Sequence, residues 1–137
     1  MKVNVIFLDY DRHQFTEQVR RHNFANAGHE FTLIDVDMKG ISAAINKGIQ
    51  LSRGSDAVVT MANDILMPDN WLLKMVEAAK AIPNTGMCGI HCVEGLGDFK
   101  EINGVTVHPN YTAFGNVLIP FKAIDEIGYF NPDFDPY

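Results

Sequence analysis

The stretch that decides the fold runs from Gly40 to Trp71, GISAAINKGIQLSRGSDAVVTMANDILMPDNW. Apolar and small residues recur at helical spacing over 41–52, which predicts an amphipathic helix. The apolar run over 57–61 predicts a buried strand that leads into Asp64. Open α/β sheets bind their ligands outside the carboxyl ends of the strands. Asp64 is therefore well placed to hold a divalent metal ion against phosphate groups.

The flanking sequence continues the alternation of strands and helices. Further strands are predicted over 3–8, 31–34, 86–90 and 113–119, and further helices over 13–27, over a segment capped by Asp69 and ended by Pro83, and over 121–127. We expect Gly28 to be the C-cap of the first helix. This order predicts a single α/β domain over residues 1–137 with a mostly parallel central sheet.

After Ile90 the pattern changes, and a small antiparallel excursion is predicted. The segment 94–109 is polar and punctuated by glycine, and Asn103-Gly104 is a hairpin turn signal.

Composition narrows the class of protein. The 137 residues, 47% of them hydrophobic and 20% charged, suit one compact domain. The 11 basic and 17 acidic residues give a net charge of −6, which argues against a nucleic acid or an anionic membrane surface as partner. No apolar run approaches the roughly 20 residues that span a bilayer, and the amino terminus lacks the features of a signal peptide. We therefore expect a cytoplasmic protein without a transmembrane segment.

Three strings carry a resemblance to a known family: GISAAINKG, VVTMANDILMPDNWL and GNVLIPFKAIDEIGYFNPDF. In order and spacing they resemble the family 2 glycosyltransferases, which have the GT-A fold. That family combines a helix with Asn-x-Gly, a strand ending in an acidic DxD-like motif, and a later glycine-containing strand that leads to a helix. The resemblance covers nearly the whole chain.

The resemblance implies an activity and its partners. The expected reaction transfers a sugar from a nucleoside-diphosphate donor, with UDP or GDP as the first nucleotides to try, to a hydroxyl of a saccharide or other acceptor. It is metal-assisted by Mn²⁺ or Mg²⁺ and inverting. Two alternatives stay open: a non-catalytic module that binds a nucleotide sugar or carbohydrate, and the donor-binding part of a longer transferase. Whether copies of the chain form a homo-oligomer is also open.

The resemblance also implies site residues. Asp64 matches the position that holds the metal on the donor diphosphate. The other implied contacts are Asp9, Tyr10, Asp35, Asp37, Asn46 and Asn63 on the donor side, and Gly115 and Asn116 on the acceptor side. Asp9 and Asp35 are each expected to end a strand, and therefore to lie with Asp64 along one edge of the sheet.

This sequence departs from the family pattern in three places, the first of which is a short segment between Asp35 and Gly40. Met61 stands where the family often has an acid, so Asp64 is the only carboxylate of the DxD-like segment. The family's acceptor-activating Asp lies just beyond a turn like 131–137, where the sequence ends. No catalytic base is therefore assigned; the candidates are Asp98, Asp133 and Asp135.

The sequence gives less support to other kinds of site. Cys88 and His91 would project to opposite faces of a strand, which argues against zinc binding with Cys92 and His108 and against a Cys-His nucleophile. Arg12 and Arg53 could reach a phosphate, although a surface role is favoured for both. Packing is favoured over sugar stacking for the aromatic residues, which are Trp71, Tyr129, Phe130, Phe134 and Tyr137.

Overall fold

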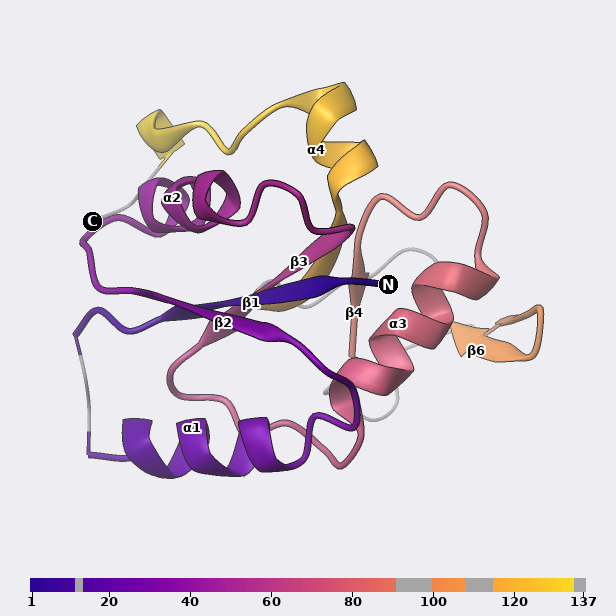
Figure 1. Cartoon of the computed structure of the whole chain (residues 1–137), viewed down its shortest axis with the longest axis horizontal. Helices are drawn as coiled ribbons and strands as arrows, with labels where there is room; N and C mark the ends of the chain where they lie inside the picture. The colour runs from indigo at the N-terminus through magenta and orange to yellow at the C-terminus, as the bar shows by residue number, and fades with distance from the viewer. Residues whose placement is uncertain (12–13, 91–99, 108–114, 135–137) are drawn as a thin grey trace.

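A central sheet with helices on both faces forms the protein (Figure 1). The computed structural model describes residues 1–11, 14–90, 100–107 and 115–134. The main sheet contains β1 (Val3–Leu8), β2 (Thr32–Val36), β3 (Ala57–Ala62), β4 (Cys88–Gly89) and β7 (Asn116–Pro120). The helices are α1 (Thr16–Ala25), α2 (Ile41–Leu51), α3 (Trp71–Ala81) and α4 (Phe121–Ile127), followed by the 3₁₀ helix η1 (Pro132–Phe134). A separate hairpin consists of β5 (Lys100–Ile102) and β6 (Val105–Val107).

The strand order of the main sheet is β2-β1-β3-β7-β4. β2, β1 and β3 are parallel, and β7 runs antiparallel between β3 and β4. The predicted α/β class with a mostly parallel sheet is confirmed. Leu8 lies opposite both Val36 and Ala62, and Met61 lies opposite Asn116. The carboxyl ends of β1, β2 and β3 therefore meet the amino end of β7 at one edge of the sheet.

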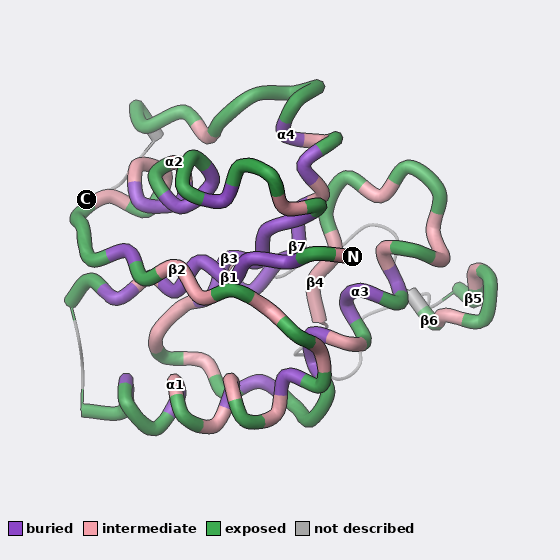
Figure 2. The backbone as a smooth tube through the Cα atoms, viewed as in Figure 1, coloured by how far each residue is buried: buried purple, intermediate pink, exposed green. Residues whose placement is uncertain are grey.

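Two apolar layers hold the helices on the sheet. Val5 and Phe7 of β1 pack in the layer that contains α3 residues and Phe24 of α1, whereas Ile6 packs with residues of α2 and α4. Side chains that alternate between two covered faces explain why β1 and β3 read as continuous apolar runs. Figure 2 shows this burial along the central strands.

Gly48 lets α2 approach the sheet closely, as its place in the helical pattern predicts. A Cβ atom at Gly48 would lie 2.4 Å from Cγ2 of Ile6, which is fully buried. Ala44, Ile45 and Ile49 line the same face of α2.

The ends of α1 and α3 differ from the predictions for a shared reason. The N-cap of α3 is Asn70, not Asp69, and its side chain makes no capping bond. Instead, the N–H groups of Asn70 and Leu72 donate to the carbonyls of Asn26 and Ala27, at 2.8 and 3.1 Å. α1 itself ends at Ala25 with Asn26 as C-cap, rather than at Gly28. Carbonyls from the chain just after α1 thus satisfy N–H groups that an isolated α3 would leave unpaired.

Gly28 serves the turn that follows α1. Its φ of +71° lies in the left-handed region, and a Cβ atom there would lie 2.5 Å from Oδ1 of Asn70. Glycine is required by both the backbone conformation and the close approach.

The predicted hairpin is confirmed in its described part. Asn103 and Gly104 have φ values of 50° and 80°, which match the type I′ turn that this dipeptide favours. The Asn103 amide also donates to the carbonyl of Ala81 at 2.5 Å, which attaches the hairpin to the end of α3.

Several predicted strands differ in length from the observed ones. β2 extends to Val36, so Asp35 lies within the strand rather than ending it. β4 is restricted to Cys88–Gly89, and β7 starts at Asn116 among the described residues, since 108–114 lie outside them. No helix in the described ranges is both long enough and apolar enough to span a bilayer.

Candidate functional site

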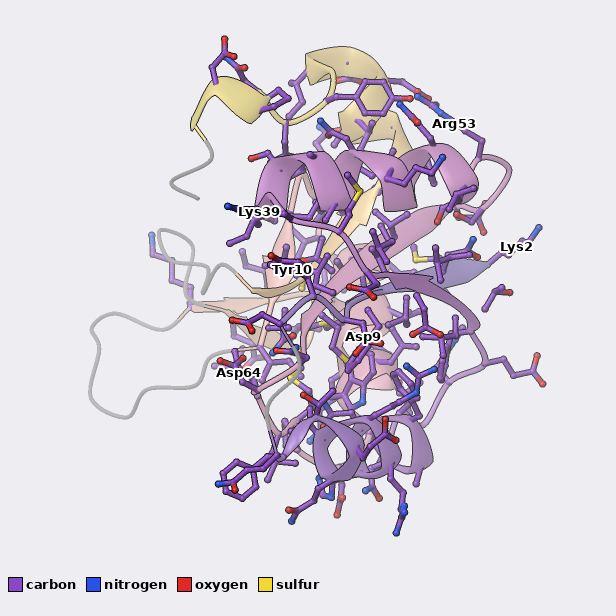
Figure 3. All side chains as sticks on the ribbon, turned by 90° about the vertical axis from the view of Figure 1, so that its left-hand side faces the viewer. Lys2, Asp9, Tyr10, Lys39, Arg53 and Asp64 are labelled. Atoms are coloured by element: carbon purple, nitrogen blue, oxygen red, sulfur yellow. The ribbon has the colours of Figure 1, made fainter. Side chains whose placement is uncertain are left out.

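Three chain segments meet at the edge where β1 and β3 end and β7 begins. Asn63 donates from its side chain to the carbonyl of Tyr10 at 3.2 Å, which joins the segments that follow β3 and β1. The backbone N–H of Ala62 is 3.1 Å from two acceptors, the carbonyl of Gly115 and Oδ1 of Asn116. Figure 3 shows Asp9, Tyr10 and Asp64 at this end of the molecule. The structure therefore brings predicted donor-side and acceptor-side residues to one place.

Asn116 has two polar atoms in its side-chain amide, and only Oδ1 has a hydrogen-bond partner among the described residues. Its side chain is 6% exposed, and its Oδ1 accepts from Ala62. Its Nδ2 is buried and has no hydrogen-bond partner in the part of the chain that the structure describes. A buried donor left unpaired costs about 1 to 3 kcal/mol.

Asp64 lies in the turn after β3 and its side chain is exposed. Within the described ranges, no three His, Cys, Asp or Glu residues are grouped closely enough to hold a metal ion. A closed protein cage for a metal is therefore absent from that part of the chain. A Mg²⁺-type ion, however, is commonly held by one or two carboxylates together with substrate phosphates and water. Asp64 fits a metal that binds together with a diphosphate.

Asp9 and Asp35 lie at the same edge as Asp64, as predicted. Asp9 follows β1 directly, and its side chain is buried. Phe7 of β1 is paired with Asp35 of β2, which places Asp35 one residue before the strand ends. The sequence prediction was right about the edge and wrong only about Asp35 being the last residue of its strand.

Arg20 lies near the same edge of the sheet, and nothing in the sequence singled it out. It donates to both carboxylate oxygens of Asp35 at 2.6 and 2.8 Å, and its guanidinium lies 5.3 Å from the ring centroid of Phe7. The hydrogen bond and charge of Asp35, with a contribution from Asp9, raise the pKa of the Arg20 guanidinium. No local motif marks Arg20, because its partner lies on another element. Asp35 is therefore paired with Arg20, and its contact with the sugar donor stays a prediction.

Asn46 connects α2 to the end of the described chain. Its Nδ2 donates to the carbonyl of Phe130 at 2.7 Å, and the N–H of Phe130 donates to its Oδ1 at 2.9 Å. This reciprocal pair seats the segment before η1 on α2, and Figure 1 shows η1 beside that helix. A donor contact of Asn46 remains a prediction, while its amide has a structural role in the Asn-x-Gly motif.

The other predicted site residues are distributed as follows. Asp37 is exposed just after β2, and Asp133 is exposed in η1. Asp98 and Asp135, with Arg12, His91, Cys92, His108 and Tyr137, lie outside the described residues.

Arg53 lies away from the edge of the sheet that carries Asp64. It pairs with Asp125 at 2.5 Å and donates to the hydroxyl of Tyr129 at 3.0 Å, and these hydrogen bonds raise its pKa. Figure 3 shows it well away from Asp64. Arg53 therefore fastens α4 to the end of α2 rather than binding a phosphate at the Asp64 edge.

The surroundings of Trp71 and Cys88 favour a structural role for both side chains. Trp71 is fully buried, and its Nε1 donates to the carbonyl of Asn23 at 2.8 Å, so it cannot stack on a sugar. Burial raises the pKa of the Cys88 thiol, which disfavours the thiolate that metal binding or nucleophilic attack would need.

Replacing Asn46 with alanine will release the segment around Phe130 from α2. Two hydrogen bonds worth about 1 kcal/mol each are lost, so amide exchange at Phe130 should accelerate and the unfolding free energy should fall by up to about 2 kcal/mol. Hydrogen exchange read by mass spectrometry over 128–134 measures the first effect. The control is Gln50→Ala, which removes an exposed amide from the same helix. Equal exchange in the two variants would contradict the seating role.

Comparison with known proteins adds the family. The sequence model described as Glycosyl transferase family 2 matches residues 2–132. No curated protein sequence matches the chain significantly. The matched region includes all of the main sheet and the edge that carries Asp64. Since the match spans nearly the whole sequence, this chain belongs to glycosyl transferase family 2.

Proposed function

We propose that this protein binds a nucleoside-diphosphate sugar at the edge formed by β1, β3 and β7, and transfers the sugar to an acceptor hydroxyl with inversion. Family membership supports glycosyl transfer in general. The observation that carries the proposal is the junction of Tyr10, Asn63 and Asn116 next to Asp64.

On the donor side, Asp64 would hold Mn²⁺ or Mg²⁺ at the diphosphate, with Asn63 beside it. When bound, the metal neutralises charge that develops on the departing diphosphate. Asp9, Asp35 and Asp37 are the proposed carboxylate contacts of the nucleoside; Asp37 is exposed, Asp35 also pairs with Arg20, and Tyr10 offers an exposed ring. Lys39 is exposed at the same end of the molecule (Figure 3) and supplies local positive charge for an anionic donor.

On the acceptor side, Gly115 and Asn116 form the wall of the proposed site. Oδ1 of Asn116 accepts from the N–H of Ala62, which holds this side chain beside the end of β3. The left-handed φ of 134° at Gly115 suits glycine, and a Cβ atom there would lie 3.6 Å from Cδ1 of Ile65. The base that would deprotonate the acceptor is sought among Asp133, Asp135 and Asp98.

A non-catalytic binding module is the second candidate. It is favoured by the DxD-like segment, in which Asp64 is the only carboxylate. A donor-binding part of a longer transferase would give the same binding without turnover.

Two measurements test these proposals in sequence. Thermal unfolding with UDP, GDP, CDP or ADP, with and without Mn²⁺, tests donor binding. At a hundredfold excess over the dissociation constant, the right nucleotide should stabilise the protein by about 2.7 kcal/mol. Release of the nucleoside diphosphate from matching nucleotide sugars with mixed acceptors then tests transfer. No stabilisation by any nucleotide would contradict the proposal, and stabilisation without release would favour a binding role.

A further inference from the structure

Asn23 is a fully buried polar residue in the last turn of α1. Its Nδ2 donates to the carbonyl of Ile65 at 2.8 Å, and its Oδ1 accepts from the N–H of Met67 at 2.8 Å. The same Nδ2 lies 3.6 Å from the sulfur of Met61. One side chain thus satisfies two backbone groups of the loop that joins β3 to α3.

The same loop is held to α1 by two further contacts. Nε2 of His22 lies 3.0 Å from the carbonyl of Met67, and Trp71 donates to the backbone carbonyl of Asn23. A loop with its backbone groups bonded to a neighbouring helix has fewer conformations available to it than one that is bonded only to water.

Asp64 lies between two fixed points of this loop. On one side, Ala62 is bonded to β7 and Asn63 to the carbonyl of Tyr10. On the other side, the next residue, Ile65, is held by Asn23. The exposed carboxylate of Asp64 is therefore presented by a backbone that is fixed before and after it.

We infer that Asn23 is a positioning residue for Asp64: it holds the β3–α3 loop in the conformation that presents this carboxylate to the metal ion of the donor. This inference rests on the proposed function. Asn23 does not contact the ligand itself. Its role resembles that of residues that hold a metal ligand in place without touching the metal. Loss of such a residue typically weakens metal affinity 10- to 100-fold.

The test compares two variants that both weaken the fold. Asn23→Ala removes the two bonds to the loop, and Gly48→Ala crowds Ile6 on the opposite face of the sheet. Calorimetric titration with UDP or GDP, with and without Mn²⁺, is done at a temperature where circular dichroism shows both variants folded. We expect Asn23→Ala to weaken Mn²⁺-dependent binding by roughly 10- to 100-fold, while Gly48→Ala binds as the unsubstituted protein does.

The outcomes separate this inference from the proposed function. Unchanged Mn²⁺-dependent affinity in Asn23→Ala would overturn the positioning role and leave the proposed function intact. An equal loss in Gly48→Ala would assign the effect to stability and also overturn it. Absence of metal-dependent nucleotide binding in the unsubstituted protein would overturn both proposals. Should Asn23→Ala not fold, His22→Ala removes only the contact with Met67, and a smaller loss of the same kind is then expected; no loss would overturn the inference.

Discussion

Replacing Asp64 with alanine will abolish Mn²⁺-dependent binding of the nucleoside diphosphate and leave the fold intact. Asp64 is the only carboxylate of the DxD-like segment, and its side chain is exposed, so it contributes little to the core. If affinity falls a hundredfold, a ligand concentration that stabilises the unsubstituted protein by about 2.7 kcal/mol will stabilise the variant by only about 0.4 kcal/mol. Thermal unfolding with the nucleotide and metal measures this difference directly.

Two controls sharpen the Asp64 experiment. Asp64→Asn keeps the shape of the side chain and removes its charge, so it should lose metal-dependent binding as alanine does. Asp69→Ala removes another exposed carboxylate from the same loop and should bind normally. Equal metal-dependent affinity in Asp64→Ala and the unsubstituted protein would refute the metal assignment, whatever the activity.

Replacing Gly48 with alanine will lower the unfolding free energy by about 3 kcal/mol, at the upper end of the usual cost of overpacking a core. The added Cβ atom would lie 2.4 to 2.8 Å from three side-chain atoms of Ile6. Ile6 is fully buried on the central strand β1 and has little room to move. Urea unfolding followed by circular dichroism measures the change.

A double-mutant cycle identifies the cause of the Gly48 effect. Ile6→Ala removes all three crowded atoms, so the cost of Gly48→Ala should be smaller in that background; contacting residues are expected to be non-additive in this way. Gly86→Ala is the matched control, because a Cβ atom there meets nothing within 4 Å. Strict additivity of the Ile6 and Gly48 substitutions would show that close packing is not the reason for the glycine.

Local sequence patterns were sufficient for most of the architecture. The apolar runs of β1 and β3 are buried on both faces, as a continuous run requires. Phe121–Ile127 is a helix followed by Gly128, as predicted, and Asn103-Gly104 forms the predicted turn. Each of these features depends on neighbours in sequence, so a short window contains the information. The family resemblance, carried by three such windows, is confirmed as well.

The partners of polar side chains were decided by the tertiary structure alone. Asn46 binds Phe130, 84 residues away, and Asn23 binds Met67, 44 residues away. Neither partner is evident from the sequence, because an amide that faces water and an amide that holds a distant backbone leave the same local pattern.

The same distinction applies to the candidate site. The sequence by itself predicted that the first three strands are parallel and end at one edge, and that Asp64 follows the third, since strands that alternate with helices along the chain form parallel sheets. Only the tertiary structure decided that Arg20 pairs with Asp35, that carbonyls after α1 cap α3, and that the loop carrying Asp64 is held from both sides. Hydrogen bonds and ion pairs act over a few ångströms in space, and their partners are fixed only once the apolar layers have brought distant segments together.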